Sequence, residues 1–375
     1  MAAFGPDSQS QNDRVATMKA VELFAGAGGL SLGLMRSGIE IVLANEIDPV
    51  CCETYQINHK NTNMISADIH DIDFVSEIDK LGFKPGQIEI VSGGPPCQGF
   101  STVGSKNKKD PRNSLFFEFL RAVSEIQPRF VLFENVSGFK RLYDGEIHNI
   151  LLQELGSLGY DIQHGLLDAS DFGLPQIRKR TIVVGARNCK GKILIPNPTH
   201  SLDCDLFGLQ KKLSLIEAIS DLPQLGSGEE SEIYLSDPVN DYQTSLRCGQ
   251  KHLTEHNASN YGEKMQKILT LIPPGGCVED LPKELRPRDY FANTYARLLP
   301  NQPAPTITRN FGTPSSSRCV HPFQNRALST REGARLQGFP DDYFFAGSKI
   351  SKNLQIGNSV PPLLGELIGK QLLRN

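Results

Sequence analysis

This 375-residue chain has no long apolar runs, no C-x-x-C motif and no strong net charge. No stretch of about 18 consecutive apolar residues occurs, so the sequence predicts no transmembrane helix. The 39 Lys and Arg residues are balanced by 42 Asp and Glu residues, and the formal net charge of −3 carries no overall signature of nucleic-acid binding. Any contact with a polyanion must therefore come from local basic patches.

The eight cysteines include no C-x-x-C pair, so no zinc ribbon is expected. Residues 1–17 form a polar tail without the apolar core of a signal peptide, and we therefore expect reduced thiols and a cytoplasmic protein. His252 and His256 have helical i, i+4 spacing, but no Glu follows the first His. A metal site is accordingly not expected there.

Short apolar segments alternate with longer amphipathic segments through the first half of the chain. The apolar segments are 20–24, 41–44, 64–67, 89–92, 130–133 and 181–185, and 114–126 is an intervening amphipathic segment. This alternation is typical of an α/β fold with a doubly wound, mostly parallel sheet. Beyond residue 187 the chain is rich in Gly, Pro, Ser and Asn and loses the rhythm, which predicts a second, smaller and irregular domain.

The first predicted strand ends in a glycine-rich loop, FAGAGGLSLG at 24–33. Its glycines allow a tight turn and a close approach to a ligand ahead of a helix N-terminus. A dinucleotide-binding G-x-G-x-x-G motif would need Gly in place of Ser31, so a ligand without a pyrophosphate is favoured. Glu46 and Asp68 end the next two strands, where carboxylates can bind ribose hydroxyls and an adenine amino group. A glycine turn with helix-capping acids is the structural alternative, but together these features favour an adenosine-containing cofactor.

The next predicted strand leads into GGPPCQG at 93–99, which places Cys97 in a loop at the ligand-binding edge of the sheet. Glu134 ends the following strand, and neighbouring strands lie about 5 Å apart. A thiol and a carboxyl group at one edge suggest a nucleophile and a general acid. A small, buried packing cysteine is the alternative interpretation of Cys97 taken alone.

The basic segment QIRKR at 176–180 follows later in the chain. In an extended segment Arg178 and Arg180 point to one side and Lys179 to the other. The two guanidinium groups could hold a carbonyl oxygen and a phosphate, or raise the thiolate fraction of Cys97. A solvated basic strand start is the alternative.

These motifs together give the chain a family resemblance. In the order of the family, they are FAGAGGLSLGL at 24–34, GGPPCQGFS at 93–101, ENV at 134–136, QIRKR at 176–180 and IGNSVPP at 356–362. PAPTITRNF at 303–311 and REGARLQGFP at 331–340 agree further. The chain resembles the cytosine-C5 DNA methyltransferases of bacterial restriction–modification systems, over nearly its whole length outside the tail.

The resemblance implies the S-adenosylmethionine-dependent methyltransferase fold, divided into three parts after the tail. Residues 18–187 would form a catalytic and cofactor-binding domain, 188–325 a target-recognition domain, and 326–375 a segment returning to the catalytic domain. Cys97 would attack C6 of a cytosine flipped out of the duplex. Glu134 would stabilise charge at N3 and the exocyclic amine, while Arg178 and Arg180 would hold O2 and the nearby backbone.

The resemblance also implies binding residues and partners. The implied cofactor-binding residues, for S-adenosylmethionine, are Phe24, Ala25, Gly26, Gly28, Gly29, Leu30, Glu46, Ile47, Asp68, Ile69, Pro96, Asn358 and Ser359. The implied DNA-binding residues are Gln98, Ser101, Lys106, Lys108, Lys109, Arg112, Gln176 and Thr308. Arg247, Arg286, Arg288 and Arg297 are candidates for reading guanines. We expect a monomer that acts on double-stranded DNA, with a cognate restriction endonuclease acting separately.

Three alternatives stay open at this point. A transfer-RNA cytosine methyltransferase shares the catalytic blocks, although the long region after residue 187 and Gln98 favour DNA. A non-enzymatic DNA-binding regulator would have no use for Cys97 and Glu134. A nicotinamide oxidoreductase is disfavoured by Ser31 and by the lack of a hydride-handling site.

Overall fold

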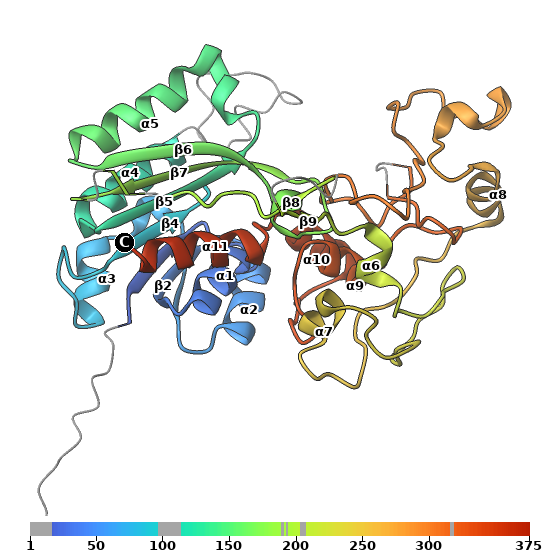
Figure 1. Cartoon of the computed structure of the whole chain (residues 1–375), viewed down its shortest axis with the longest axis horizontal. Helices are drawn as coiled ribbons and strands as arrows, with labels where there is room; N and C mark the ends of the chain where they lie inside the picture. Colours follow the sequence, from blue (N-terminus) through green and yellow to red (C-terminus); the bar gives the residue numbers. More distant parts are fainter. Residues whose placement is uncertain (1–16, 97–113, 189–190, 193, 203–207, 316–318) are drawn as a thin grey trace, which may run out of the picture.

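The computed structural model of the chain describes residues 17–96, 114–188, 191–192, 194–202, 208–315 and 319–375. Within these residues the chain forms two lobes (Figure 1). The large lobe is built on a seven-stranded sheet, and the small lobe consists mainly of loops and short helices.

The sheet of the large lobe has the strand order β3-β2-β1-β4-β5-β7-β6. Its strands are β1 (Lys19–Leu23), β2 (Glu40–Glu46), β3 (Asn63–Ser66), β4 (Ile90–Gly93), β5 (Phe130–Val136), β6 (Asp161–Asp168) and β7 (Lys179–Ala186). The pairs among β1 to β5 are parallel, whereas β7 runs antiparallel to both β5 and β6. The predicted doubly wound, mostly parallel sheet is therefore confirmed.

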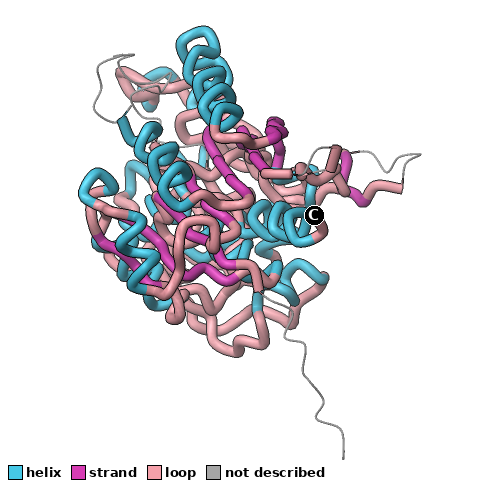
Figure 2. The backbone as a smooth tube through the Cα atoms, turned by 90° about the vertical axis from the view of Figure 1, so that its left-hand side faces the viewer, coloured by secondary structure: helices cyan, strands magenta, loops and turns pink. Residues whose placement is uncertain are grey.

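Helices cover both faces of this sheet, and Figure 2 shows the strands lying between them. The helices of the large lobe are α1 (Gly29–Ser37), α2 (Pro49–Asn58), α3 (Phe74–Lys80), α4 (Ser114–Ile126), α5 (Glu146–Ser157) and α11 (Pro362–Leu373). Alternate strand residues face opposite layers: Val21 and Leu23 join the cluster with α3, α4 and α5, and Ala20 joins the one with α1 and α11. Both faces of β1 are thereby buried.

Local signals set several helix ends. The side chain of Asp48 accepts hydrogen bonds from the first turn of α2, whose first residue is Pro49. Gly38 ends α1 with a left-handed φ of 101°, which glycine adopts without strain. Ser329 and Glu332 form a capping box at the start of α9 (Thr330–Leu336).

The antiparallel end of the sheet departs from the sequence prediction. Strand β6 was not predicted, because its sequence DIQHGLLD lacks an apolar run and most of its residues are only partly buried or exposed. It lies at the edge of the sheet, where a strand needs less apolar surface. The segment 181–185 is a strand as predicted. It belongs to β7, which runs antiparallel to both of its neighbours, β5 and β6.

The small lobe has its own hydrophobic cluster. Its helices are α6 (Leu215–Ile219), α7 (Asp241–Arg247), α8 (Glu263–Leu271), α9 and α10 (Lys349–Asn358), and β8 (His200–Ser201) pairs with β9 (Gln210–Lys211) near its start. The main cluster joins α6, α9 and α10 and includes Ala27 of the glycine-rich turn. The chain returns to the large lobe at α11, which packs along α1. The small lobe is thus in direct contact with the turn that follows β1.

Short 3-10 helices complete the described structure: η1 (Ile69–Asp71), η4 (Phe139–Gly145), η5 (Ala169–Phe172), η6 (Val278–Asp280) and η7 (Lys283–Leu285). In the described parts of the chain, no helix has both the length and the apolarity that crossing a membrane requires.

Candidate active site

A cavity of about 860 Å³ lies at the carboxyl ends of β1, β2, β4 and β5. Its wall includes twelve of the thirteen predicted cofactor residues: Phe24, Ala25, Gly26, Gly29, Leu30, Glu46, Ile47, Asp68, Ile69, Pro96, Asn358 and Ser359. Gly28 is the exception and faces away from the cavity toward His59 and Tyr343. Glu134 and Arg180 line the same cavity. Residues far apart in the sequence therefore meet at the edge of the sheet that the strand pattern predicted.

The Glu46 carboxylate holds the glycine-rich turn against the end of β2. Its Oε2 accepts a hydrogen bond from Gly26 N at 2.8 Å, and its Oε1 accepts from Ile47 N and Asp48 N at 2.8 and 2.9 Å. A carboxylate offers about four acceptor positions, so these bonds leave Oε2 able to accept one more donor. Glu46 is thus a fixed acceptor in the cavity wall for a hydroxyl group of a ligand.

Ile47 and Asp68 add an apolar face and a second acceptor to the wall. Ile47 is 62% exposed although apolar, and a flat ring in the cavity would cover this surface. Asp68 Oδ1 accepts hydrogen bonds from His70 N at 3.0 Å and from His70 Nδ1 at 2.6 Å. These hydrogen bonds hold the pKa of the Asp68 carboxyl below its usual value. Asp68 therefore stays ionised and can accept a hydrogen bond from an amino group.

The end of α10 closes the cavity from the C-terminal side. The Ser359 hydroxyl donates to the carbonyl oxygen of Gln355 at 2.7 Å, so it is used within its own helix. Asn358 is exposed and lines the cavity. Of these two predicted residues, Asn358 is the one with its side-chain amide available to a ligand.

Glu134 and Arg180 form an ion pair where β5 meets β7. Arg180 Nε lies 2.8 Å from Glu134 Oε1, and both side chains are largely buried. Burial raises the pKa of Glu134 above its usual value, and the charges of Arg180 and Arg178 partly offset this. A buried carboxyl with a raised pKa takes up a proton more readily than an exposed one and can pass it to a bound group.

Gly94 lets the loop after β4 approach Glu134 closely. A Cβ atom on Gly94 would lie 2.8 Å from Glu134 Oε2. Asn135, beside Glu134, donates from Nδ2 to the carbonyl oxygen of Pro95 at 3.0 Å and fixes the start of the Pro-Pro segment. Cys97 follows directly and lies outside the described residues, so its role as nucleophile stays a prediction.

Arg178 takes a different position from the one predicted. It is fully buried and does not line the cavity. Its Nη1 donates to the carbonyl oxygen of Ile307 at 2.9 Å, and its Nη2 donates to those of Gly357 and Ser359 at 2.9 and 2.8 Å. Five N–H donors in a planar fork suit this bridging of separate chain segments. The geometry therefore makes Arg178 a support of the site, and Arg180 the arginine that faces the cavity.

The predicted DNA-binding residues fall into three groups. Gln98, Ser101, Lys106, Lys108, Lys109 and Arg112 lie outside the described residues. Gln176 is fully buried, where its side chain bonds to Leu336 O, to Gln337 Oε1 and to Ile307 N. Contact with DNA, which stays a prediction, would require this side chain to leave these partners. Thr308 is exposed, and its DNA contact remains a prediction.

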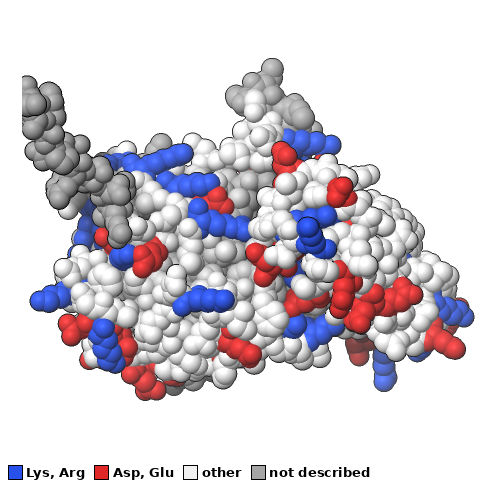
Figure 3. Space-filling view, turned by 90° about the horizontal axis from the view of Figure 1, so that it is seen from below, with Lys and Arg blue, Asp and Glu red and all other residues white. Residues whose placement is uncertain are grey.

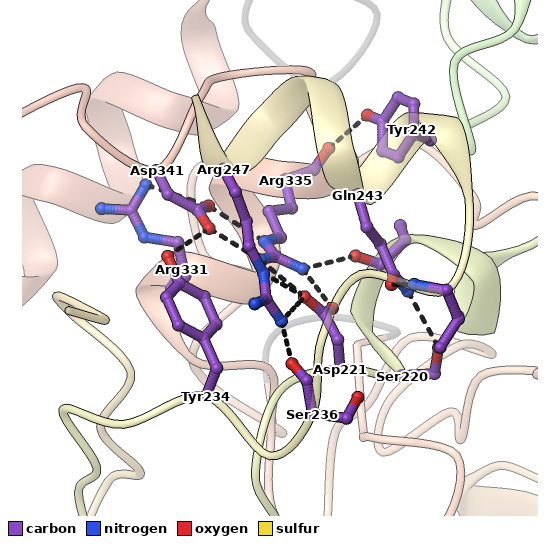
Figure 4. A network of polar contacts seen from close by, with 12 residues as sticks. Ser220, Asp221, Tyr234, Ser236, Tyr242, Gln243, Arg247, Arg331, Arg335 and Asp341 are labelled. Atoms are coloured by element: carbon purple, nitrogen blue, oxygen red, sulfur yellow. Dashed lines mark hydrogen bonds and ion pairs between the residues drawn. The ribbon is translucent and has the colours of Figure 1, made fainter. Parts of the chain in front are cut away.

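Two of the four arginines suggested for reading guanines are buried in the small lobe. Arg247 is paired with Asp221, which is itself bridged to Asp341 through Arg335 (Figure 4). Arg297 donates to main-chain carbonyl oxygens and to Asn325 in the core of the lobe. Removing either guanidinium group would leave buried acceptors without a donor, so both residues serve the fold of the lobe.

The other two arginines lie nearer the surface. Arg286 donates to the carbonyl oxygens of Leu281 and Glu279 and is only partly buried, whereas Arg288 is exposed. Arg288 is therefore the most accessible of the four. In the view of Figure 3, Lys and Arg side chains lie along the upper left over the large lobe, whereas acidic side chains gather at the right over the small lobe.

A buried carboxyl group in the cavity floor was not singled out from the sequence. Glu22 of β1 is 2% exposed, lines the cavity and accepts a hydrogen bond from the Ser31 hydroxyl. Burial raises its pKa to about 8, so it holds its proton at neutral pH. An acid inside the apolar segment 20–24 was the available signal, because an apolar strand rarely carries a charge.

The described part of the chain contains no group of three or more His, Cys, Asp or Glu side chains arranged to hold a metal ion. The polar groups that line the cavity are carboxylates, side-chain amides, hydroxyl groups, one arginine, one histidine, one cysteine and main-chain groups.

Comparison with known proteins gives consistent matches over the whole chain. The family model described as C-5 cytosine-specific DNA methylase matches residues 18–374. The Type II methyltransferase M.DdeI of Desulfomicrobium norvegicum is 33% identical over 95% of this chain and 88% of its own. M1.HphI of Haemophilus parahaemolyticus, also a Type II methyltransferase, is 33% identical over 94% and 86%.

Among solved structures, a prophage-encoded Escherichia coli protein described as a DNA modification methyltransferase is similar. It superposes with a TM-score of 0.75 at 28% identity and covers 96% of this chain and 99% of that one. The whole arrangement of two lobes is therefore shared with a protein of known structure.

Proposed function

The chain belongs to the C-5 cytosine-specific DNA methylase family and is a DNA cytosine-5-methyltransferase, and on this basis we propose its cofactor, chemical route and biological setting. The methyl donor is S-adenosylmethionine, and the substrate is a cytosine flipped out of a specific double-stranded DNA sequence. One observation carries the proposal: the Glu134–Arg180 pair lies in the wall of the same cavity as twelve of the predicted cofactor residues. A bound cofactor and a flipped base could meet there.

The residues that line the cavity support S-adenosylmethionine as its ligand. The exposed apolar side chain of Ile47 would cover the adenine, Asp68 would accept from its amino group, and Glu46 Oε2 would accept from a ribose hydroxyl. When bound, this cofactor supplies an electrophilic methyl group. The sequence 188–325 is proposed as the target-recognition domain that selects the cytosine.

The reaction would begin with the Cys97 thiolate forming a bond to C6 of the cytosine. The displaced electron pair moves through C5 and C4 to N3, where Glu134 supplies a proton. The raised pKa of Glu134 supports this role, because burial favours the protonated carboxyl more than in an exposed glutamate. Arg180, paired with Glu134, would fix the carboxyl and face the O2 side of the base.

Addition at C6 makes C5 an enamine-like carbon that is nucleophilic enough to take the methyl group. A base then removes the C5 proton, the C5–C6 double bond forms again as the bond from sulfur to C6 breaks, and N3 returns its proton to Glu134. Cys97 leaves as a thiolate, so it is regenerated for the next turnover.

The proposed setting is a bacterial restriction–modification system. The relatives named above are Type II methyltransferases, and a chain of this kind would act as a monomer on DNA in the cytoplasm, apart from any cognate endonuclease. The basic residues between 101 and 112 would contact the phosphate backbone beside Cys97.

A suicide substrate tests the chemical route. DNA with 5-fluorocytosine at the target position should be methylated at C5 and then stay attached to Cys97, because a base cannot remove fluorine as it removes a proton. We expect an adduct that survives denaturing electrophoresis, depends on S-adenosylmethionine and maps to the peptide containing Cys97. Glu134→Gln should slow its formation, since charge at N3 is then less well stabilised.

Absence of this adduct from an enzyme that methylates the unmodified sequence would exclude the covalent route. Cys97→Ser is the matched control, and it should bind cofactor and yield no adduct. Methylation of transfer RNA in place of duplex DNA, measured in parallel, would favour the transfer-RNA alternative. Bisulfite sequencing of DNA from an expressing host would report the recognised sequence.

A further inference from the structure

The outer side of the glycine-rich turn is held by two buried side chains that do not line the cavity. The Tyr343 hydroxyl, from the segment between α9 and α10, donates to the carbonyl oxygen of Ala27. Its oxygen also lies 2.9 Å from Nε2 of His59, at the end of α2. Tyr343 and His59 are 3% and 2% exposed. The turn thus has the cavity on one side and a tyrosine–histidine contact on the other.

Gly28 shows how closely these two side chains approach the turn. Its φ is +82°, and a Cβ atom there would lie 2.4 Å from His59 Nε2 and 2.8 Å from Tyr343 Oη. A side chain at this position would therefore displace both residues. This accounts for Gly28, the predicted cofactor residue that does not line the cavity.

Packing on both sides restrains the tyrosine and the histidine. The Tyr343 ring packs against Phe339 and Phe345 in the small lobe, with centroid distances of 4.8 and 5.3 Å. The His59 ring lies 4.4 Å from that of Tyr55, whose hydroxyl contacts the Ser31 hydroxyl at 2.6 Å. Burial lowers the pKa of His59 to about 4, so its ring is neutral and carries one N–H. Since the Tyr343 hydroxyl donates to Ala27, its contact with His59 is a hydrogen bond in the tautomer that has the proton on Nε2.

We propose that Tyr343 is a positioning residue for the cofactor: its hydroxyl, supported by His59, holds the glycine-rich turn in the conformation that binds S-adenosylmethionine. The inference rests on the proposed function, because it takes S-adenosylmethionine as the ligand of the cavity. Without the hydroxyl, the turn samples other conformations as well. Cofactor binding must then restore the binding conformation, and this costs free energy. The loss falls on cofactor affinity and leaves the methyl-transfer step unchanged.

Tyr343→Phe tests this proposal, and Tyr160→Phe is its matched control. Tyr160 is also a buried tyrosine that donates to a main-chain carbonyl oxygen, that of Pro128 at 2.7 Å, but it does not line the cavity or touch the turn. Both variants lose a buried hydroxyl that donates to a main-chain carbonyl oxygen, and Tyr343→Phe also loses the contact with His59 Nε2. Calorimetry would measure S-adenosylmethionine affinity in the absence of DNA, and single-turnover methylation at saturating cofactor would measure the chemical step.

Tyr343→Phe should weaken S-adenosylmethionine binding by about fivefold to tenfold, as expected when the hydrogen bond that holds the turn is lost, with the single-turnover rate within about twofold of wild type. Tyr160→Phe should bind the cofactor as wild type does. Equal affinities in the two variants, or a slower chemical step at unchanged affinity, would overturn the positioning role.

His59→Phe gives a second route if Tyr343→Phe does not fold. This change keeps an aromatic ring beside Tyr55 but removes the Nε2 donor, and it should weaken cofactor binding in the same direction. Unchanged affinity in that variant would likewise overturn the proposal. A wild type that binds no S-adenosylmethionine at all would overturn the proposed function, and the positioning role with it.

Discussion

Replacing the buried Glu22 by Gln should remove a pH dependence from the stability of the protein. The Glu22 carboxyl is 2% exposed at the floor of the cavity, and burial is the main reason that its pKa rises from 4.5 to about 8. The hydrogen bond from Ser31 opposes this shift but does not cancel it. A glutamine side chain at this position would have nearly the same shape and no ionisable proton.

The sign of the effect follows from which state keeps the proton. Above pH 4.5 the unfolded chain releases the Glu22 proton, whereas the folded protein keeps it until about pH 8. The unfolded state is therefore favoured by about 1.4 kcal/mol for each pH unit within this window. Between about pH 5 and about pH 7, wild type should lose about 2 to 3 kcal/mol of unfolding free energy that the variant keeps.

Urea unfolding at these two pH values measures the effect as a difference between wild type and variant. Taking this difference removes the contributions of all other titrating groups, which both proteins share. Glu154→Gln, at an exposed position on α5, is the control and should leave the pH dependence of wild type unchanged. If Glu22→Gln shows the same pH dependence as this control, Glu22 does not hold a proton in the folded protein and our interpretation of its burial is wrong.

Two further substitutions test the support of the site. Gly94→Ala places a Cβ atom 2.8 Å from Glu134 Oε2 and should displace this carboxyl group. The methylation rate at saturating substrates should fall by about tenfold to a hundredfold, with cofactor affinity unchanged. Full activity would show that this contact does not position Glu134. Arg178→Lys leaves buried carbonyl oxygens, including that of Ser359, without donors, and urea unfolding should report a loss of about 3 kcal/mol or more. An Arg178→Lys variant as stable as wild type but inactive would assign Arg178 to the reaction itself.

Much of the large lobe could be predicted because its signals are local. Each apolar segment is a few residues long, and parallel strands connected by helices must present their carboxyl ends at one edge. The pattern alone therefore predicted that Glu46, Asp68 and Glu134 meet in one place. Strand β6 escaped prediction because an edge strand needs little apolar surface.

The roles of the arginines could not be predicted, because they depend on residues distant in the chain. Arg178 and Arg180 differ by two positions and share one side of an extended segment, yet only Arg180 faces the cavity. The partners of Arg178 are carbonyl oxygens 129 to 181 residues further along, which converge only in the folded protein. From the sequence, Arg247 and Arg297 would be expected at the surface because arginine is charged. Tertiary contacts bury both side chains.

The sequence by itself therefore determined the parallel part of the sheet, the edge at which the site forms and the family of the chain, because these follow from short-range pattern and motif order. The tertiary structure alone decided which charged groups face the cavity and which support it, as with Arg180 and Arg178. It also brought Tyr343 of the small lobe onto the turn after β1, 316 residues earlier in the chain. Burial and long-range hydrogen bonds determine the orientation and the pKa of a side chain. Neither can be inferred from the residues next to it in the sequence.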